Sequence, residues 1–183
     1  MNIKDGEKLI KIARASIYSV KINFEFSEKR GVFVTIYSYP KKSLRGCIGF
    51  IEGVFGLSEG VYKAAKEAAF SDTRFEPIDI NKEDFIVEVS ILTKPRILKE
   101  NFLEKIRIGK DGLIIEKGYN KGVLLPKVAV EYKLNSREFL ECCCNKAGLG
   151  KEEWKDKDCR IYTFQTCVFS EEKPNGKVRK LNF

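Results

Sequence analysis

The chain has 183 residues, 43% of them apolar, which is enough for one ordinary domain or two small ones around a real core. It carries 34 Lys and Arg against 26 Asp and Glu, a formal net charge of +8, and contains no histidine. Mechanisms that need an imidazole, such as Ser-His-Asp, Cys-His and metalloprotease arrangements, are therefore excluded. Any acid–base chemistry must use carboxylates, lysines, tyrosines or cysteines.

The start of the chain, MNIKDGEKLIKI, carries charges where a secretory signal needs an apolar stretch. The sequence also contains no run of about 18 apolar residues. We therefore expect a cytoplasmic protein that has no membrane partner.

The positive charge has two interpretations. Abundant Lys, Glu and Ile, with Gln165 as the single glutamine, are typical of a heat-adapted, thermophilic protein. A weakly supported alternative is a nucleic-acid surface, which long-range attraction to a polyanion would favour. We interpret the densest basic segment, EEKPNGKVRK, as part of a loose C-terminal tail over residues 171–183.

The first elements are a helix and a hairpin. Apolar residues recur three and four apart from Asp5 to about Val20, which predicts an amphipathic helix. The β-branched and aromatic run from Arg30 to Pro40 predicts a strand, and the turn PKKS leads into a second strand from Ser43 to Glu52. A second helix is then predicted for GLSEGVYKAAKEAAFSD, and a third strand for DFIVEVSILTKP.

The region from Glu104 to Val130 predicts two or three short strands. The dipeptide Asp111-Gly112 is a strong hairpin turn, and a second turn is expected around Asn120 to Gly122. A further hairpin follows from this pattern.

The last elements are a helix and a strand. The segment LNSREFLECCCNKAGLG predicts a helix, with Asn135 and Glu138 as its capping box and Gly148 as its end. A final strand is predicted from Cys159 to Phe169.

The order of elements is a helix and then two successive strand–strand–helix–strand groups. Neighbouring hairpins favour antiparallel β-sheets with helices packed on one side, so the predicted fold class is α+β. A duplicated ββαβ unit is a hypothesis from this order alone, because the residues show no repeat.

The six cysteines do not have metal-ligand spacing. They contain no C-x-x-C pair, and three consecutive cysteines cannot all turn toward one ion, so we predict no metal site. On the predicted helix, Cys143 shares an apolar face with Phe139 and Leu140, which indicates a small core residue. A disulfide from Cys159 or Cys167 to the triple cysteine is the alternative to free thiols.

The stretch KSLRGCIGFIEG carries the main candidate site. Alternation along a strand sends Gly46 and its alternate neighbours into the core, and sends Arg45, Cys47 and Gly49 to the other face. Glycines inside a strand mark a bulge or a close approach of a ligand or backbone. The segment is therefore either a ligand site or a tightly bent hairpin with small residues where a helix crosses.

Several segments of the chain together resemble the AMMECR domain family, named after an Alport-syndrome chromosomal region. The resemblance covers about Gly6 to Phe169. It is carried by the segments LRGCIG, AAFSDTRFEPI, EVSILTKP, DGLIIEKG, GVLLPKVAVE and, in outline, EFLECCCNKAGL.

The resemblance implies one domain over residues 1–170, built from two packed subdomains of roughly residues 1–100 and 101–170. The Arg45–Cys47 segment then faces a cleft between them. The family has no established activity, and we predict no cofactor. Prokaryotic relatives often accompany a Memo-type protein and a radical-SAM protein, which implies a shared small-molecule or modification pathway.

The family's cleft residues are carried over onto matching positions of this chain. Two departures stand out: Thr73 replaces the family's usual proline, and Lys127 its usual glutamine. The matching positions are Arg45, Cys47, Asp72, Arg74, Glu88 and Ser90, with Asp111 and Glu131 as further positions.

Three functions are compatible with these residues. In a binding module, Arg45, Gly46, Cys47, Gly49, Arg74 and Ser90 hold a small anionic ligand, a peptide or a partner protein. In an enzyme, Cys47 is the nucleophile or redox thiol, Arg45 supports the thiolate or anchors an anionic substrate, and Glu88 or Asp72 moves protons. A nucleic-acid-binding module is the third. Alternatively, Asp72 and Arg74 only pair with each other, and Glu88 pairs with an arginine.

Overall fold

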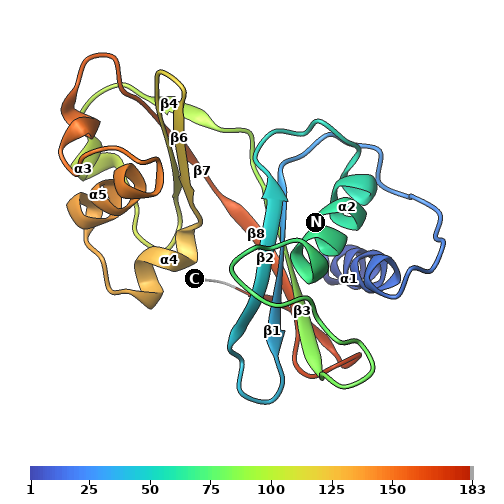
Figure 1. Cartoon of the computed structure of the whole chain (residues 1–183). Coiled ribbons are helices and arrows are strands. Elements are labelled where there is room, and N and C mark those ends of the chain that lie inside the picture. The colour runs from blue at the N-terminus through green and yellow to red at the C-terminus, as the bar shows by residue number, and fades with distance from the viewer. Residues whose placement is uncertain (182–183) are drawn as a thin grey trace. The chain divides into compact units, whose positions relative to one another are not determined.

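The computed structural model describes residues 1–181 and contains two compact units, which are described separately (Figure 1). The first unit contains Met1–Leu92 and, among the described residues, 167–181, and the second contains Thr93–Thr166. Both units combine helices with antiparallel strands, so the predicted α+β class is confirmed.

The first unit is a five-stranded sheet with the order β2-β1-β3-β8-β9 and two helices on one of its faces (Figure 1). Strand β1 pairs antiparallel with both β2 and β3. Its elements are α1 (Ile3–Ile17), β1 (Val32–Ser38), β2 (Leu44–Phe50), α2 (Leu57–Phe70), β3 (Phe85–Leu92), β8 (Thr166–Glu171) and β9 (Val178–Leu181).

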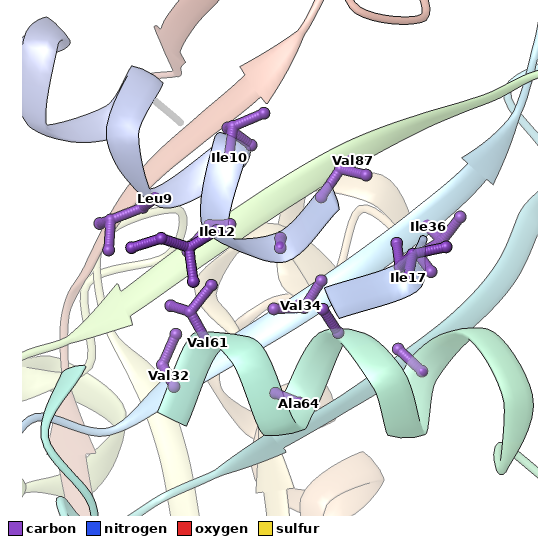
Figure 2. Close-up of a cluster of buried hydrophobic side chains, with 14 of the residues drawn as sticks. Leu9, Ile10, Ile12, Ile17, Val32, Val34, Ile36, Val61, Ala64 and Val87 are labelled. Atoms are coloured by element: carbon purple, nitrogen blue, oxygen red, sulfur yellow. The ribbon is translucent and has the colours of Figure 1, made fainter. Parts of the chain in front are cut away.

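The core of the first unit lies between the sheet and its two helices (Figure 2). Helix α1 begins with a capping box between Asn2 and Asp5, and its apolar face carries Leu9 and Ile12 into this core. Alternate residues of β1, such as Val34, point into this core because successive residues of a strand face opposite sides of the sheet. Large apolar residues buried in this way are the main source of the unit's stability.

The second unit is a four-stranded sheet with the order β4-β7-β5-β6. Helix α5 starts at the predicted capping box of Asn135 and Glu138, and Gly148, with φ +74°, follows its C-terminus. Its elements are β4 (Arg96–Leu98), α3 (Phe102–Lys105), β5 (Gly112–Lys117), β6 (Asn120–Leu124), α4 (Pro126–Glu131), α5 (Ser136–Lys146), the 3₁₀ helix η1 (Glu153–Lys155) and β7 (Arg160–Phe164).

The same strand order occurs in both sheets. In the first, a hairpin (β1, β2) is followed by α2 and by β3, which pairs with the free side of β1. In the second, the hairpin β5, β6 is followed by the short α4, by α5 and η1, and by β7, which pairs with the other side of β5. The ββαβ arrangement proposed from the element order is therefore present twice as topology.

Three predictions for the second unit are wrong. The dipeptide Asp111-Gly112 is not a hairpin turn: Asp111 accepts hydrogen bonds from Arg107, and Gly112 begins β5. The turn expected around Asn120 to Gly122 lies instead at Gly118, which has φ +59°, and Asn120 begins β6. The segment PKVAV is helix α4 rather than a strand, because Pro126 fits the first turn of a helix.

Two predictions near the C-terminus also need correction. The strand expected from Cys159 to Phe169 is divided into β7 and β8, which belong to different sheets. The expected loose tail forms a turn and strand β9, which pairs with β8 from Val178 to Leu181. Predictions for residues 182 and 183 lie outside the described residues.

Among residues 1–181, no helix is both long and apolar enough to cross a lipid bilayer.

Candidate functional site

The candidate segment forms β2, an edge strand of the first sheet. Its side chains alternate as predicted from Gly46 onward, but Leu44, which was expected in the core, is 36% exposed beside a register shift in the β1–β2 pairing. Ile48 and Phe50 pack against the core under α2. Gly46 faces the same helix so closely that an added Cβ would lie 1.9 Å from the carbonyl oxygen of Ala68. A side chain at position 46 would clash with helix α2, which crosses β2 here, as the bent-hairpin interpretation expected.

A second glycine of the motif also meets the protein's own backbone. A Cβ at Gly49 would lie 2.2 Å from the carbonyl oxygen of Val32. Packing within the unit thus accounts for both glycines, and their presence does not by itself indicate a ligand.

The loop after α2 forms hydrogen bonds with both backbone polar groups of Cys47, its N–H and its carbonyl oxygen. The Cys47 N–H donates to Asp72 Oδ2 at 2.9 Å, and Arg74 Nη2 donates to the Cys47 carbonyl oxygen at 3.3 Å. Arg74 also donates from Nε and Nη2 to the two Asp72 oxygens at 2.9 and 2.6 Å. We call these three residues the Cys47 clamp. They protect backbone groups that an edge strand would otherwise expose.

The charges of the Cys47 clamp are strongly paired. The Arg74 guanidinium, helped by the amides of Cys47 and Arg74, lowers the pKa of Asp72 from 3.8 to about 2, although burial opposes this shift. Asp72 in turn raises the pKa of Arg74. The proposed pairing of Asp72 with Arg74 is therefore present, and it leaves Asp72 ionised at neutral pH.

Arg45 is bound by a residue that the sequence did not indicate. Its Nε and Nη2 donate to the Glu83 carboxylate at 3.0 and 3.1 Å, and Nη2 reaches the Glu76 carbonyl oxygen at 3.3 Å. Glu83 also accepts from the Asp79 amide at 3.0 Å, which fixes its orientation. An arginine on an edge strand is expected to pair with a carboxylate, but nothing in the sequence selects Glu83 from the other acidic residues.

The Cys47 thiol is half-buried and accepts a hydrogen bond from Thr35 Oγ1 at 3.3 Å. Thr35 lies opposite Cys47 on one side and opposite Glu88 on the other, so these three residues form a row across β2, β1 and β3. Glu88 and Ser90 are both buried. The Ser90 hydroxyl has no hydrogen-bond partner within residues 1–181.

The other cysteines give no second candidate thiol. All six are free, so the disulfide alternative is not what the structure contains. Burial raises the pKa of Cys143 strongly, that of Cys144 to about 11, and that of Cys159. Within residues 1–181, no group of three or more metal-ligating side chains is close enough to hold an ion.

The remaining carried-over positions belong to the second unit, apart from Thr73, which is exposed in the clamp loop. Asp111 accepts from Arg107 Nε and Nη2, both at 2.9 Å, and from Gln165 Nε2 at 3.2 Å. Lys127 is buried in the first turn of α4, and Glu131 is exposed at its end. Asp111 therefore has a structural role that links its loop to Gln165.

Comparisons with known proteins give consistent matches along the whole chain. A family model described as AMMECR1 matches residues 6–169. Protein MJ0810 of Methanocaldococcus jannaschii is 43% identical over 97% of this chain and 96% of its own length. Protein Ta0236 of Thermoplasma acidophilum is 43% identical over 96% and 91% of the two chains.

A solved structure matches the fold. The crystal structure of the uncharacterized protein PH0010 from Pyrococcus horikoshii has a TM-score of 0.94 and 37% sequence identity. The match covers 100% of this chain and 99% of that one.

Proposed function

The chain belongs to the AMMECR1 family, and on that premise we propose that it is a binding module whose Arg45–Cys47 segment recognises a peptide or a partner protein without reacting with it. The names of its relatives state no activity. The proposal therefore depends on the geometry around β2.

The observation that carries the proposal is the Cys47 clamp. Asp72 and Arg74 hold the backbone N–H and the carbonyl of Cys47, which belong to two successive peptide units, so the segment is fixed before any partner arrives. Preorganisation of this kind lowers the entropic cost of binding. A nucleophile needs something different, which is a base that can take a proton near neutral pH.

The alternative enzyme is less well supported because two of its proposed groups, Asp72 and Arg45, already have partners. Asp72, with a pKa of about 2, is too weak a base to move protons near pH 7. Arg45, which was to stabilise a thiolate or hold an anionic substrate, pairs with Glu83 at 2.9 Å. A Cys47 nucleophile would need activation by groups beyond these.

The same pairing favours a peptide or protein over a small anion or a nucleic acid. Arg45 and Arg74 each bind a carboxylate through two nitrogens, so both guanidinium charges are largely compensated. Recognition would then use the half-buried Cys47 thiol, because the Ser90 hydroxyl is buried and a partner cannot contact it. A Memo-type or radical-SAM protein, expected from the resemblance, is a partner of this chemical class.

The test is selection of peptides from a displayed library on the intact chain, followed by binding assays on two variants. Cys47→Ser keeps the approximate size of the side chain but removes the nucleophilic sulfur, so selected peptides should retain their affinity. Cys47→Trp covers the segment and should remove most binding. Circular dichroism would verify that both variants are folded.

Two outcomes would contradict the proposal. Peptides that bind Cys47→Trp as well as wild type recognise some other surface. Loss of binding in Cys47→Ser, with a covalent adduct on Cys47 in the wild type, would favour the enzyme instead.

A further inference from the structure

The first unit contains a hollow of about 670 Å³ that includes no residue of the Arg45–Cys47 segment or of the Cys47 clamp. One wall is α1, and the other is the β8–β9 hairpin, which contains the basic segment first interpreted as a loose tail. The volume lies within the range of small-molecule sites. Its principal lining residues are Ile10, Lys11, Arg14, Tyr18, Lys177 and Val178.

The polar part of this hollow is built around a buried ion pair. Arg14 Nε and Nη2 donate to the two oxygens of Glu171 at 2.7 and 2.8 Å, and Nη2 also donates to the Phe85 carbonyl oxygen at 2.7 Å. The Val87 amide donates to the same carboxylate at 2.9 Å. The Arg14 side chain is 10% exposed, so its guanidinium is held in one orientation.

One donor of this guanidinium is still available. Nη1 of Arg14 has no hydrogen-bond partner within residues 1–181, and Arg14 lines the hollow. Although the Arg14 side chain is mostly buried, Nη1 is not one of the fully buried side-chain atoms that lack a partner, so water or a ligand in the hollow can reach it. The two N–H groups of Nη1 therefore provide a fixed position for an acceptor inside the hollow.

Two lysines add positive charge that the protein does not compensate. Lys11 on α1 and Lys177 in the turn before β9 are both exposed and line the hollow. Neither has an ion-pair partner within 4.0 Å in the described part of the chain. Glu7 is the remaining acid of the lining, since Glu171 is used by Arg14. The unpaired groups thus favour an anion.

The walls of the hollow are apolar and partly aromatic. Tyr18 is 41% and Val20 is 54% exposed, so both leave apolar surface open at the hollow. Ile10 and Val178 extend this surface toward Arg14. An apolar body placed here would lose contact with water, while an anionic head remains near the cations.

We propose that this hollow is a binding site for a small carboxylate with an aromatic or branched apolar body. The carboxylate accepts from Arg14 Nη1 and lies near Lys11 and Lys177, and the apolar body packs against Tyr18 and Val178. The site is independent of the proposed peptide surface. Because the head is charged and the body is apolar, both parts contribute to recognition.

The experiment is a titration of the full chain with indole-3-acetate, monitored by calorimetry and by backbone amide shifts. The neutral isostere indole-3-acetamide is the ligand control. We expect saturable binding of the acetate with shifts in α1 and in the turn before β9. The amide should bind at least about tenfold more weakly, the equivalent of about 1.4 kcal/mol.

Variants connect this binding to the proposed residues. The double variant Lys11→Ala with Lys177→Ala should weaken the acetate about tenfold and leave the amide unchanged. Lys4→Ala, an exposed lysine of the same helix outside the lining, is the matched control. Ala15→Trp should fill the hollow and abolish binding of both probes.

The proposal is overturned if the acetate gives no saturable shifts, if acetate and amide bind equally, or if the shifts map outside α1 and the β8–β9 hairpin. Equal acetate affinity in the double lysine variant would overturn it as well. This variant changes only exposed side chains, so the test does not depend on whether Ala15→Trp folds.

Discussion

The hairpin, helix and return strand of the first unit have a close counterpart in the second. Strand β2, read as LRGCIG, and β6, read as NKGVL, each have a cation followed by a glycine. A Cβ at Gly122 would lie 2.5 Å from the carbonyl oxygen of Cys143 in α5, as one at Gly46 would approach Ala68 in α2. The shared cation and glycine therefore belong to the architecture.

What differs between the two arrangements is more informative about function. Asp72 and Arg74 form hydrogen bonds with the backbone of Cys47 in β2, whereas Val123 occupies the corresponding position of β6. Arg45 pairs with Glu83 from a distant loop, and Lys121 pairs with Glu116 directly across its own hairpin, at 2.7 Å. The Cys47 clamp is thus an addition to a common framework.

The largest expected effect concerns β8, the strand that follows β3 in the order of the first sheet. In Glu171→Gln the buried Arg14 loses its counter-charge, so the free energy of unfolding should fall by about 3–5 kcal/mol. Urea denaturation would measure this. Glu25→Gln, in the exposed pair with Lys8, is the control and should unfold near wild type. Similar stabilities for the two variants would contradict the buried pair.

The second prediction tests the shared glycines. Gly46→Val and Gly122→Val both force a side chain against a helix backbone, and each should cost about 3 kcal/mol or more. Gly150→Ala is the control, since the nearest neighbour of an added Cβ there is a side-chain oxygen of Glu153 at 3.1 Å rather than a backbone atom. A large loss at Gly46 alone would mean that the two arrangements are not equivalent.

The third prediction concerns the Cys47 clamp of the first unit. Asp72→Asn weakens the bonds to Arg74 and Cys47 and should cost about 2 kcal/mol at pH 7. Because the pKa of Asp72 is lowered from 3.8 to about 2, its contribution is complete above about pH 4 and is lost as pH falls toward 2. The difference between wild type and variant should shrink over that range.

Hydrogen exchange gives an independent measure of the Cys47 clamp. The Cys47 amide should be protected in wild type and exchange faster in Asp72→Asn. A pH-independent difference in stability, with unchanged exchange at Cys47, would exclude the Cys47 clamp as described.

The smallest effect is expected at the ionic cluster of the second unit. Lys117 contacts Glu153 at 2.7 Å and Asp156 at 2.6 Å, and these carboxylates raise its pKa. The cluster lies at the surface, so Lys117→Met should change Tm by at most about 3 °C. A loss of stability as large as that caused by Asp72→Asn would mean that the second unit has its own equivalent of the Cys47 clamp.

Local sequence patterns predicted most of the fold. Capping residues such as Asn135 and Glu138 act within one turn, and alternation along β2 follows from backbone geometry, so both were visible in the sequence. The α+β class and the repeated order of elements depended on these local patterns. The failures were segments with ambiguous local preference, such as PKVAV, where a proline can start a helix or end a strand.

The candidate site was predicted less completely because its contacts span the chain. Arg45 and Glu83 are separated by 38 residues, and Arg14 and Glu171 by 157, so no spacing rule connects them. Asp72 and Arg74 were identified because they lie two residues apart and resemble a family segment. The basic residues near Lys177 suggested a loose end, since their pairing with β8 depends on a strand partner rather than on their own composition.

The most direct measurement of the central claim is the rate at which Cys47 reacts with a small alkylating agent in the folded protein, followed by mass spectrometry from pH 5 to 9. Cys142 is also half-buried and is the matched control within the same molecule. If the Cys47 clamp only holds a recognition surface, the two thiols should react at rates within about threefold of each other and with the same pH dependence. Reaction of Cys47 at least about 100 times faster, and already complete near pH 5, would show an activated nucleophile and contradict the account.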